Sequence, residues 1–178
     1  MPVETDYSKI GGWVDGTLVP VEKLLAHQKG IKHKAVSVFI VNDDKTLLQQ
    51  RSLSKYHSPG LWANSCCTHP LWNEDPRDCA VRRLDEELGL TGLSPRYRHT
   101  LEYRAEVGDG LIEPEVVDVF VAQWTKGATL RPNPEEVAST AWISIDEVSQ
   151  IVETNPESYS AWLRIYMQNH SQSIFLDQ

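Results

Sequence analysis

The sequence has no long apolar run and no excess of basic residues, and each shortage excludes a class of protein. No apolar stretch approaches the roughly 20 residues that a bilayer-spanning helix needs. The first residues, Met1 to Asp6, lack the basic and apolar regions of a secretory signal, so we expect a cytoplasmic protein. The formal net charge of −8 argues against general nucleic-acid binding, which requires a basic surface. An anionic small molecule would therefore need a few cations gathered locally.

Cysteine is scarce, and repeats and linkers are missing. The three cysteines are Cys66, Cys67 and Cys79, an odd number with two adjacent, which favours reduced thiols over a disulfide framework. A chain of 178 residues without a repeat, a low-complexity segment or a linker is typical of one domain. We therefore expect a single domain over 1–178, with a core at about 14–150 and C-terminal helices within 145–169.

The hydrophobic patterns predict strands around one central helix. Asp75-Pro76 is a strong helix start, and the helix should run to Leu88 and stop at Gly89. Ser144 with Glu147 forms a capping box that opens a later helix. We expect other helices at 21–28 and 158–168, a turn within 14–18 between short strands, and strands at 34–41, 46–51, 97–107, 111–124 and 138–143. This order favours an α/β (α+β) sandwich, a mixed sheet flanked by helices.

The central helix carries an apolar arc and two charged pairs. Its apolar arc consists of Ala80, Val81, Leu84 and Leu88. Arg83 and Glu87 border that arc, and the pair Arg82 and Glu86 lies on the expected solvent side. Both could be surface ion pairs worth only about 0.3–0.5 kcal/mol. A carboxylate such as Glu87 beside a buried face nevertheless requires a cation.

Residues 74–90 of this helix region resemble the Nudix box, including Arg82-Arg83-Leu84-Asp85-Glu86-Glu87-Leu88-Gly89-Leu90. The resemblance implies a Nudix-like sandwich in which Glu87 binds Mg²⁺ together with a diphosphate. Two positions depart from the box. Thr68 stands where the box has its first glycine, and Arg83 stands where hydrolases have a metal-binding glutamate. These departures match the isomerase branch of the fold.

The segment from Trp62 to Pro70 resembles the signature around the catalytic cysteine of type I isopentenyl-diphosphate isomerases, and the likeness extends from about Val14 to Trp162. In an extended segment, Cys67 and His69 share one face and Cys66 points away. Taken alone, a cysteine beside apolar neighbours is as readily inert packing. Packing is our interpretation for Cys66 and Cys79, whereas the resemblance implies catalysis by Cys67.

Two carboxylates, Glu113 and Glu115, lie two residues apart on a strand and so face the same side, about 7 Å apart. Alone, such a pair is often solvated. The resemblance groups both with His27, His33 and His69 as ligands of one divalent metal, Mn²⁺, Zn²⁺ or Mg²⁺.

The resemblance also implies a substrate site. It assigns diphosphate binding to four cations, which are Lys23, Arg51, Lys55 and Arg83, although any one of them alone would be a solvated surface charge.

The implied activity interconverts isopentenyl diphosphate and dimethylallyl diphosphate, in isoprenoid biosynthesis, by metal-assisted protonation and deprotonation of the alkene. Cys67 and Glu115 would act on opposite faces of the substrate, and Tyr103 would relay or orient the proton. Trp162 would stabilise the cationic intermediate by a cation–π contact of about 2 kcal/mol or more. We expect nearby cations to favour the thiolate of Cys67.

Two rival functions are also compatible with parts of the sequence. A Nudix hydrolase of a nucleoside diphosphate derivative would share the fold, but it should keep the glutamate that Arg83 replaces. A non-catalytic protein with structural zinc should show short paired spacings such as C-x-x-C, which this sequence lacks. We therefore expect a small isoprenoid diphosphate as the partner, with neither nucleic acid nor membrane.

Overall fold

The computed structural model describes residues 8–176. Residues 1–7 and 177–178 lie outside the described part, and with them the segment Met1 to Asp6 on which the expected absence of a signal rests. No helix among the described residues is long and apolar enough to cross a membrane.

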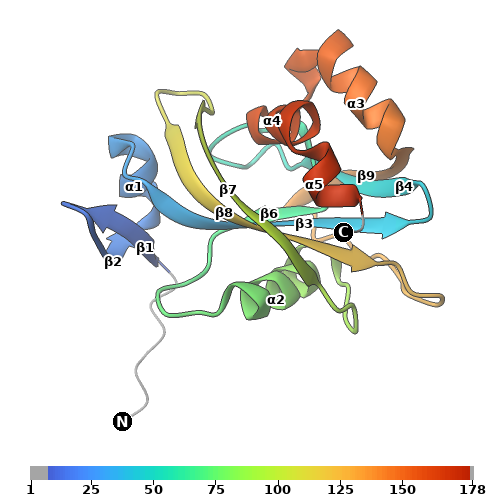
Figure 1. Ribbon diagram of the computed structural model, residues 1–178, viewed down its shortest axis with the longest axis horizontal. Coiled ribbons are helices and arrows are strands. Elements are labelled where there is room, and N and C mark those ends of the chain that lie inside the picture. The colour runs from blue at the N-terminus through green and yellow to red at the C-terminus, as the bar shows by residue number, and fades with distance from the viewer. Residues whose placement is uncertain (1–7, 177–178) are drawn as a thin grey trace.

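The described residues form one nine-stranded sheet with helices on both sides (Figure 1). The strands are β1 (Lys9–Val14), β2 (Thr17–Glu22), β3 (His33–Asn42), β4 (Lys45–Arg51), β5 (Trp62–Ala63), β6 (Cys66–Thr68), β7 (Arg96–Glu106), β8 (Ile112–Gln123) and β9 (Val137–Ser144). The helices are α1 (Lys23–Lys29), α2 (Pro76–Leu88), α3 (Ile145–Thr154), the 3₁₀ turn η1 (Pro156–Ser158), α4 (Ala161–Asn169) and α5 (Ser171–Phe175). Strand β3 pairs in parallel with β8, whereas its pairings with β1, β4 and β6 are antiparallel. The predicted mixed sheet flanked by helices is therefore confirmed.

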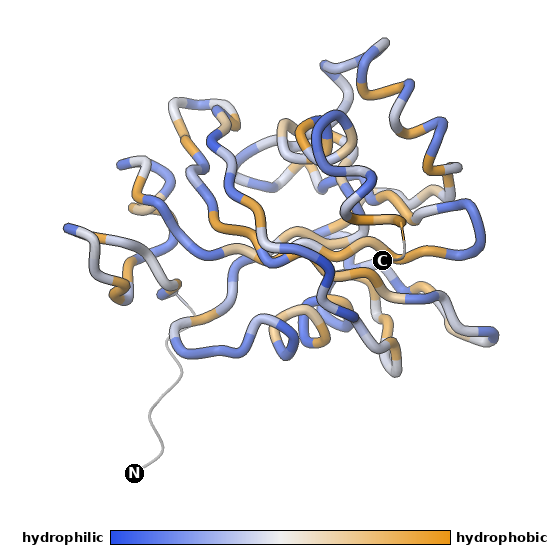
Figure 2. Tube along the Cα trace, in the orientation of Figure 1, coloured by the Kyte–Doolittle hydropathy of each residue, from blue (hydrophilic) through white to orange (hydrophobic). Residues whose placement is uncertain are grey.

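Strand β3 occupies the centre of the sheet and is buried on both faces. Val36, Val38 and Ile40 point into the core that α2 covers, while Ala35 and Phe39 point into the core beneath α3, α4 and α5. Figure 2 shows this centre as a hydrophobic stretch surrounded by more polar loops. A strand covered on both sides needs apolar residues at nearly every position, as this one has from Ala35 to Val41 with Ser37 as the exception.

Helix α2 follows its sequence signals closely. The Asp75 carboxylate accepts hydrogen bonds from the backbone N–H groups of Arg77 and Asp78, and Gly89 ends the helix with a φ of 62°. A Cβ on Gly89 would meet the Arg131 Cβ at 2.7 Å, so the loop between β8 and β9 packs directly on this glycine. Glycine is thus required both by the left-handed backbone and by the close approach of the loop.

The predicted apolar arc of α2 is wrong at one position, because Val81 is 42% exposed. Cys79 is fully buried in its place. Arg82 donates two hydrogen bonds to Glu74, and its Nη2 lies 3.8 Å from the Cys79 Sγ, so this side chain covers the thiol.

The first and last predicted helices begin later than expected. Val21 belongs to β2, and the Glu22 side chain caps α1 by accepting a hydrogen bond from the Leu25 N–H. Ser160 caps α4, so that helix begins at Ala161, and the preceding turn η1 contains Ser158. The helix α5 was not predicted.

Candidate active site

The strand register assembles the site. Parallel pairing places His33 of β3 opposite Glu115 of β8, and antiparallel pairing places Ser37 of β3 opposite Cys67 of β6. Cys66 is fully buried in the core against α2, while Cys67 packs on the core of the opposite face. The alternation predicted for this segment is therefore confirmed.

Buried imidazoles and carboxylates face one another on this side of the sheet. The Glu115 Oε1 lies 3.2 Å from the His33 Nε2 and 2.8 Å from the His69 Nε2. The His27 Nε2 lies 3.5 Å from the Glu113 Oε1. The structure thus brings together the five residues that the sequence resemblance grouped as metal ligands.

Two of these histidines are oriented by the backbone. The His27 Nδ1 lies 2.7 Å from the Lys23 carbonyl oxygen, and the His33 Nδ1 lies 2.6 Å from that of Ile31. A carbonyl oxygen only accepts, so each Nδ1 carries a proton, and a neutral ring then presents the lone pair of its Nε2 to a carboxylate.

The donor set fits a divalent cation. Among the described residues, the buried His27 Nε2 has no hydrogen-bond partner, although it faces a carboxylate oxygen. A metal ion bound by both atoms would relieve the repulsion between their lone pairs. Four residues, His27, His33, His69 and Glu115, offer ligand atoms that all lie within 4.8 Å of one another. Metal-binding histidines commonly donate a hydrogen bond from the nitrogen that does not bind the metal to a backbone carbonyl, and this bond orients the ring.

Burial and charge set the protonation of this cluster. Burial lowers the pKa of His69 to about 3, which makes its imidazole neutral, as a metal ligand must be. Burial raises the pKa of Glu113, and the neighbouring charge of Glu115 raises it further. Burial alone would also raise the pKa of Glu115, but its interactions with the His33 and His69 side chains outweigh burial and hold that pKa well below its usual range.

Tyr103 bridges the two carboxylates. Its hydroxyl lies 2.7 Å from the Glu115 Oε2 and 3.2 Å from the Glu113 Oε2. Burial and the two carboxylate charges raise its pKa well above the usual value. Tyr103 is therefore a neutral phenol that donates a hydrogen bond toward Glu115.

Cys67 is held as a thiol. Ser37 donates a hydrogen bond of 3.2 Å to its sulfur. Burial and the charges of Glu115 and Glu113 raise the pKa of Cys67 well above its usual value, and Arg51 opposes this only weakly. The expectation that nearby cations favour the thiolate is wrong for the protein alone, because burial and the carboxylates dominate.

Cys67, Glu115 and Trp162 line one cavity. All four predicted diphosphate ligands, Lys23, Arg51, Lys55 and Arg83, line it as well. The Arg51 guanidinium lies over the buried Trp162 ring, 5.2 Å from its centroid. The same guanidinium donates hydrogen bonds to the backbone carbonyls of His57 and Ser58, which fix its position.

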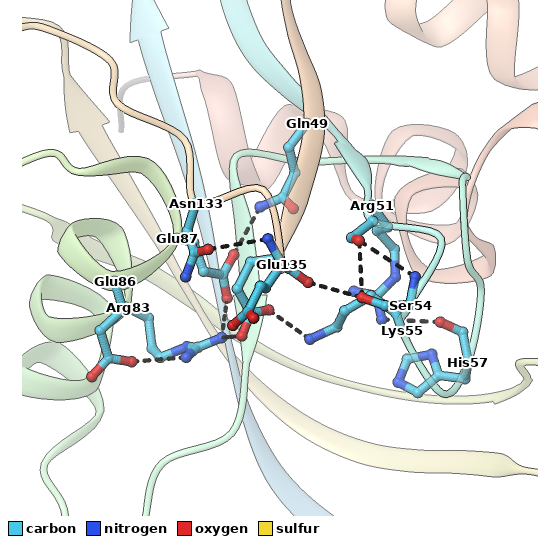
Figure 3. A network of polar contacts seen from close by, with 12 residues as sticks. Gln49, Arg51, Ser54, Lys55, His57, Arg83, Glu86, Glu87, Asn133 and Glu135 are labelled. Atoms are coloured by element: carbon cyan, nitrogen blue, oxygen red, sulfur yellow. Dashed lines mark hydrogen bonds and ion pairs between the residues drawn. The ribbon is translucent and has the colours of Figure 1, made fainter.

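Acidic side chains neutralise two of these cations. Figure 3 shows Arg83 and Gln49 converging on Glu87 from different elements, with hydrogen bonds of 2.6 Å and 2.9 Å. Glu136 lies 2.6 Å from the Lys55 Nζ and 3.4 Å from the Arg83 Nη2. The pair Arg83–Glu87 was predicted.

Glu136 and His57 are among the residues of the site that sequence reasoning missed. The His57 Nε2 lies 3.2 Å from the Glu113 Oε1. Both residues come from irregular loops, where no periodic pattern marks a direction. The only available signals were a histidine soon after the expected strand 46–51 and an acid within a proline-containing loop.

Comparisons with known proteins agree with this geometry. A model of the NUDIX domain matches residues 31–163. The isopentenyl-diphosphate Delta-isomerase of Dinoroseobacter shibae is 58% identical over 93% of this chain and 94% of its own length. The enzyme of the same name from Roseobacter denitrificans is 57% identical with the same coverage.

Solved structures are similar in fold. The DR0079 protein of Deinococcus radiodurans superposes with a TM-score of 0.70 at 14% identity, covering 89% of this chain and 96% of that one. A MutT protein from Methanosarcina mazei gives a TM-score of 0.60 at 17% identity, covering 76% and 90%.

Proposed function

This chain belongs to the NUDIX domain family and, within it, to the isopentenyl-diphosphate Delta-isomerases, and we propose that it interconverts isopentenyl diphosphate and dimethylallyl diphosphate at the cavity described above. The observation that carries the proposal is the presence of Cys67, Glu115 and Trp162 in one cavity with four cations. A Nudix hydrolase is not favoured, because its metal-binding glutamate is replaced by Arg83, which pairs with Glu87.

The diphosphate group is bound first in this proposal. Lys23, Arg51, Lys55 and Arg83 supply the positive charge that an otherwise acidic protein needs at this point. Arginine can offer two parallel N–H donors to phosphate oxygens, and lysine acts as a compact charge. Glu87 would hold Mg²⁺ between itself and the diphosphate. Anchoring the diphosphate fixes the hydrocarbon part of the substrate in the interior of the cavity.

Proton transfer then moves the double bond. In one direction, an acid delivers a proton to the terminal methylene carbon of isopentenyl diphosphate, and a base removes a proton from the carbon next to the C–O carbon. One proton enters and one leaves, so the product has the same composition. We assign Glu115 and Cys67 to this pair on opposite faces of the substrate, their roles exchanging with direction. Tyr103, whose hydroxyl lies 2.7 Å from the Glu115 Oε2, would relay or orient this proton.

The tertiary cation between the two transfers must be kept from water. Trp162 is 1% exposed and offers an aromatic face, so a cation–π contact of about 2 kcal/mol or more would stabilise the cation there. His27, His33, His69, Glu113 and Glu115 would hold one divalent metal, Mn²⁺, Zn²⁺ or Mg²⁺, whose charge strengthens the acidity of Glu115. The three free cysteines support residence in a reducing compartment, the cytoplasm.

Proton nuclear magnetic resonance of isopentenyl diphosphate in deuterated buffer with Mg²⁺ and Mn²⁺ tests the proposal. We expect dimethylallyl diphosphate to form and deuterium to enter both compounds. Cys67→Ala and Glu115→Gln should abolish turnover while pyrophosphate still binds. Cys66→Ala is the matched control, because this neighbouring thiol faces the opposite core and its loss should leave activity intact. Full activity in either site variant would overturn its assigned role, and release of phosphate without isomerisation would favour a hydrolase.

A further inference from the structure

His57 was not among the residues that the resemblance assigned to the site. Its buried imidazole lies beside the proposed metal ligands. It lies in the loop between β4 and β5 and is 5% exposed. Its Nε2 lies 3.2 Å from the Glu113 Oε1, the same oxygen that faces the His27 Nε2 at 3.5 Å. The His27 and His57 rings stack with centroids 5.5 Å apart and planes inclined by 23°.

The loop fixes this position. The carbonyl oxygen of His57 accepts a 3.0 Å hydrogen bond from the Arg51 Nη2, and the next backbone N–H, of Ser58, donates to the Val107 carbonyl. The His57 ring also makes edge contacts with the rings of Tyr56 and Trp162. The hydrogen bonds of the loop and the ring contacts therefore hold the His57 imidazole against Glu113.

The distances match those between neighbouring ligands of one cation. Metal–nitrogen and metal–oxygen bonds of about 2.0–2.2 Å at right angles place adjacent donors about 3 Å apart and opposite donors about 4.3 Å apart. The donor atoms of His27, His57 and Glu113 lie within 4.8 Å of one another, with two separations of 3.2 Å and 3.5 Å. The backbone carbonyl oxygen of Lys23 accepts a hydrogen bond from the His27 Nδ1, so the proton of a neutral His27 ring lies on Nδ1. The His27 Nε2 then carries a lone pair and cannot donate a hydrogen bond to Glu113.

We propose that His57 is a further protein ligand of the divalent cation, bound on the side of Glu113, so that four imidazoles and two carboxylates surround it. This inference rests on the metal site of the proposed function. Imidazole suits Zn²⁺, Co²⁺ or Fe²⁺ better than Mg²⁺, so a fourth histidine shifts the site toward such transition metals. With these protein donors, the cation would act through Glu115, and the substrate would meet Glu115 rather than the cation itself.

Two substitutions at position 57 distinguish a metal ligand from a side chain that only donates a hydrogen bond to Glu113. His57→Ala removes the ring, and His57→Gln retains an amide N–H that can donate to Glu113 but offers a transition metal only a weak oxygen ligand. His99→Gln is the matched control, since His99 is half-buried and its ring contacts that of His170, away from Glu113. Thermal unfolding of each variant checks that it is folded.

Two measurements on the purified 178-residue chain decide the question. Competition with a chromophoric chelator gives the Zn²⁺ affinity, and pulsed electron paramagnetic resonance of the Mn²⁺-loaded protein counts the bound imidazole nitrogens. We expect both His57 variants to lose at least about 10-fold in Zn²⁺ affinity and one of four nitrogens, while His99→Gln changes neither.

Parental affinity and nitrogen count in His57→Gln would overturn the inference and leave His57 as a hydrogen-bond donor to Glu113. The same nitrogen count in the parent and in His57→Ala would overturn it as well. If the parent chain binds neither Zn²⁺ nor Mn²⁺, the metal site of the proposed function fails together with this inference, whereas failure of the His57 variants alone leaves that function intact.

Discussion

Glu136 forms ion pairs with two cations that a diphosphate would also bind, so removing the charge of Glu136 should strengthen diphosphate binding. Its carboxylate lies 2.6 Å from the Lys55 Nζ and 3.4 Å from the Arg83 Nη2, with all three side chains about one-fifth exposed. These two ion pairs must loosen or share their cations when a diphosphate binds. Glu136 and the ligand therefore compete.

The substitution Glu136→Gln keeps the shape of the side chain and removes the charge. After screening by solvent, each pair contributes about 0.5–1 kcal/mol, so the two together contribute about 1–2 kcal/mol. Since 1.4 kcal/mol corresponds to a tenfold change, the Kd for inorganic pyrophosphate should fall roughly 5- to 30-fold. The free energy of unfolding of the unliganded protein should fall by about the same 1–2 kcal/mol.

Glu135→Gln is the matched control. It removes the same charge one residue away, and Glu135 is exposed and makes no ion pair within the described part of the chain. Calorimetric titration with pyrophosphate and Mg²⁺ measures the affinity, and urea unfolding measures the stability. If Glu136→Gln binds pyrophosphate as the parent does, or more weakly, the competition is refuted and Glu136 supports binding.

Three further predictions concern stability, reactivity and metal. Gly89→Ala should cost about 2–4 kcal/mol of unfolding free energy, because its Cβ would lie 2.7 Å from the Arg131 Cβ at a φ of +62°, whereas Gly92→Ala, with open space around it, should cost only about 1 kcal/mol. Equal losses in urea unfolding would contradict this reasoning. The raised pKa of Cys67 predicts slow alkylation by iodoacetamide at pH 8 in the metal-free protein and a rate that still rises with pH beyond 9, and Cys67→Ala isolates its share by mass spectrometry. Reaction at the rate of free cysteine at pH 8 would disprove the shift. Chelation of the divalent metal should lower Tm, because a ligand at one hundred times its Kd stabilises the folded state by about 2.7 kcal/mol; an unchanged Tm in a scan with and without chelator would contradict metal binding.

The central elements of the fold could be predicted because their signals are local. Asp75 and Gly89 mark both ends of α2, and the structure places the cap and the left-handed turn at these residues. The alternation of Cys66 and Cys67 likewise follows from the two-residue repeat of a strand. Such features depend only on neighbouring residues in the chain.

The loop residues of the site could not be predicted, because tertiary packing places them. His57 reaches Glu113 across 56 positions of the chain, and its direction is set by hydrogen bonds of the loop to Arg51 and Val107. Glu136 meets Lys55 across 81 positions. The burial of Cys79 in preference to Val81 depends in the same way on the side chain of Arg82.

The pairing of β3 with β8 has a consequence for how this sequence can vary. His33 lies opposite Glu115, and both Glu113 and Glu115 face the site only because the strand alternates from this fixed point. Deleting or inserting a single residue in β8 between the site and the valines that follow would turn both acids to the opposite face of the sheet. Length changes in relatives should therefore be confined to the turn between β7 and β8 and to other surface loops.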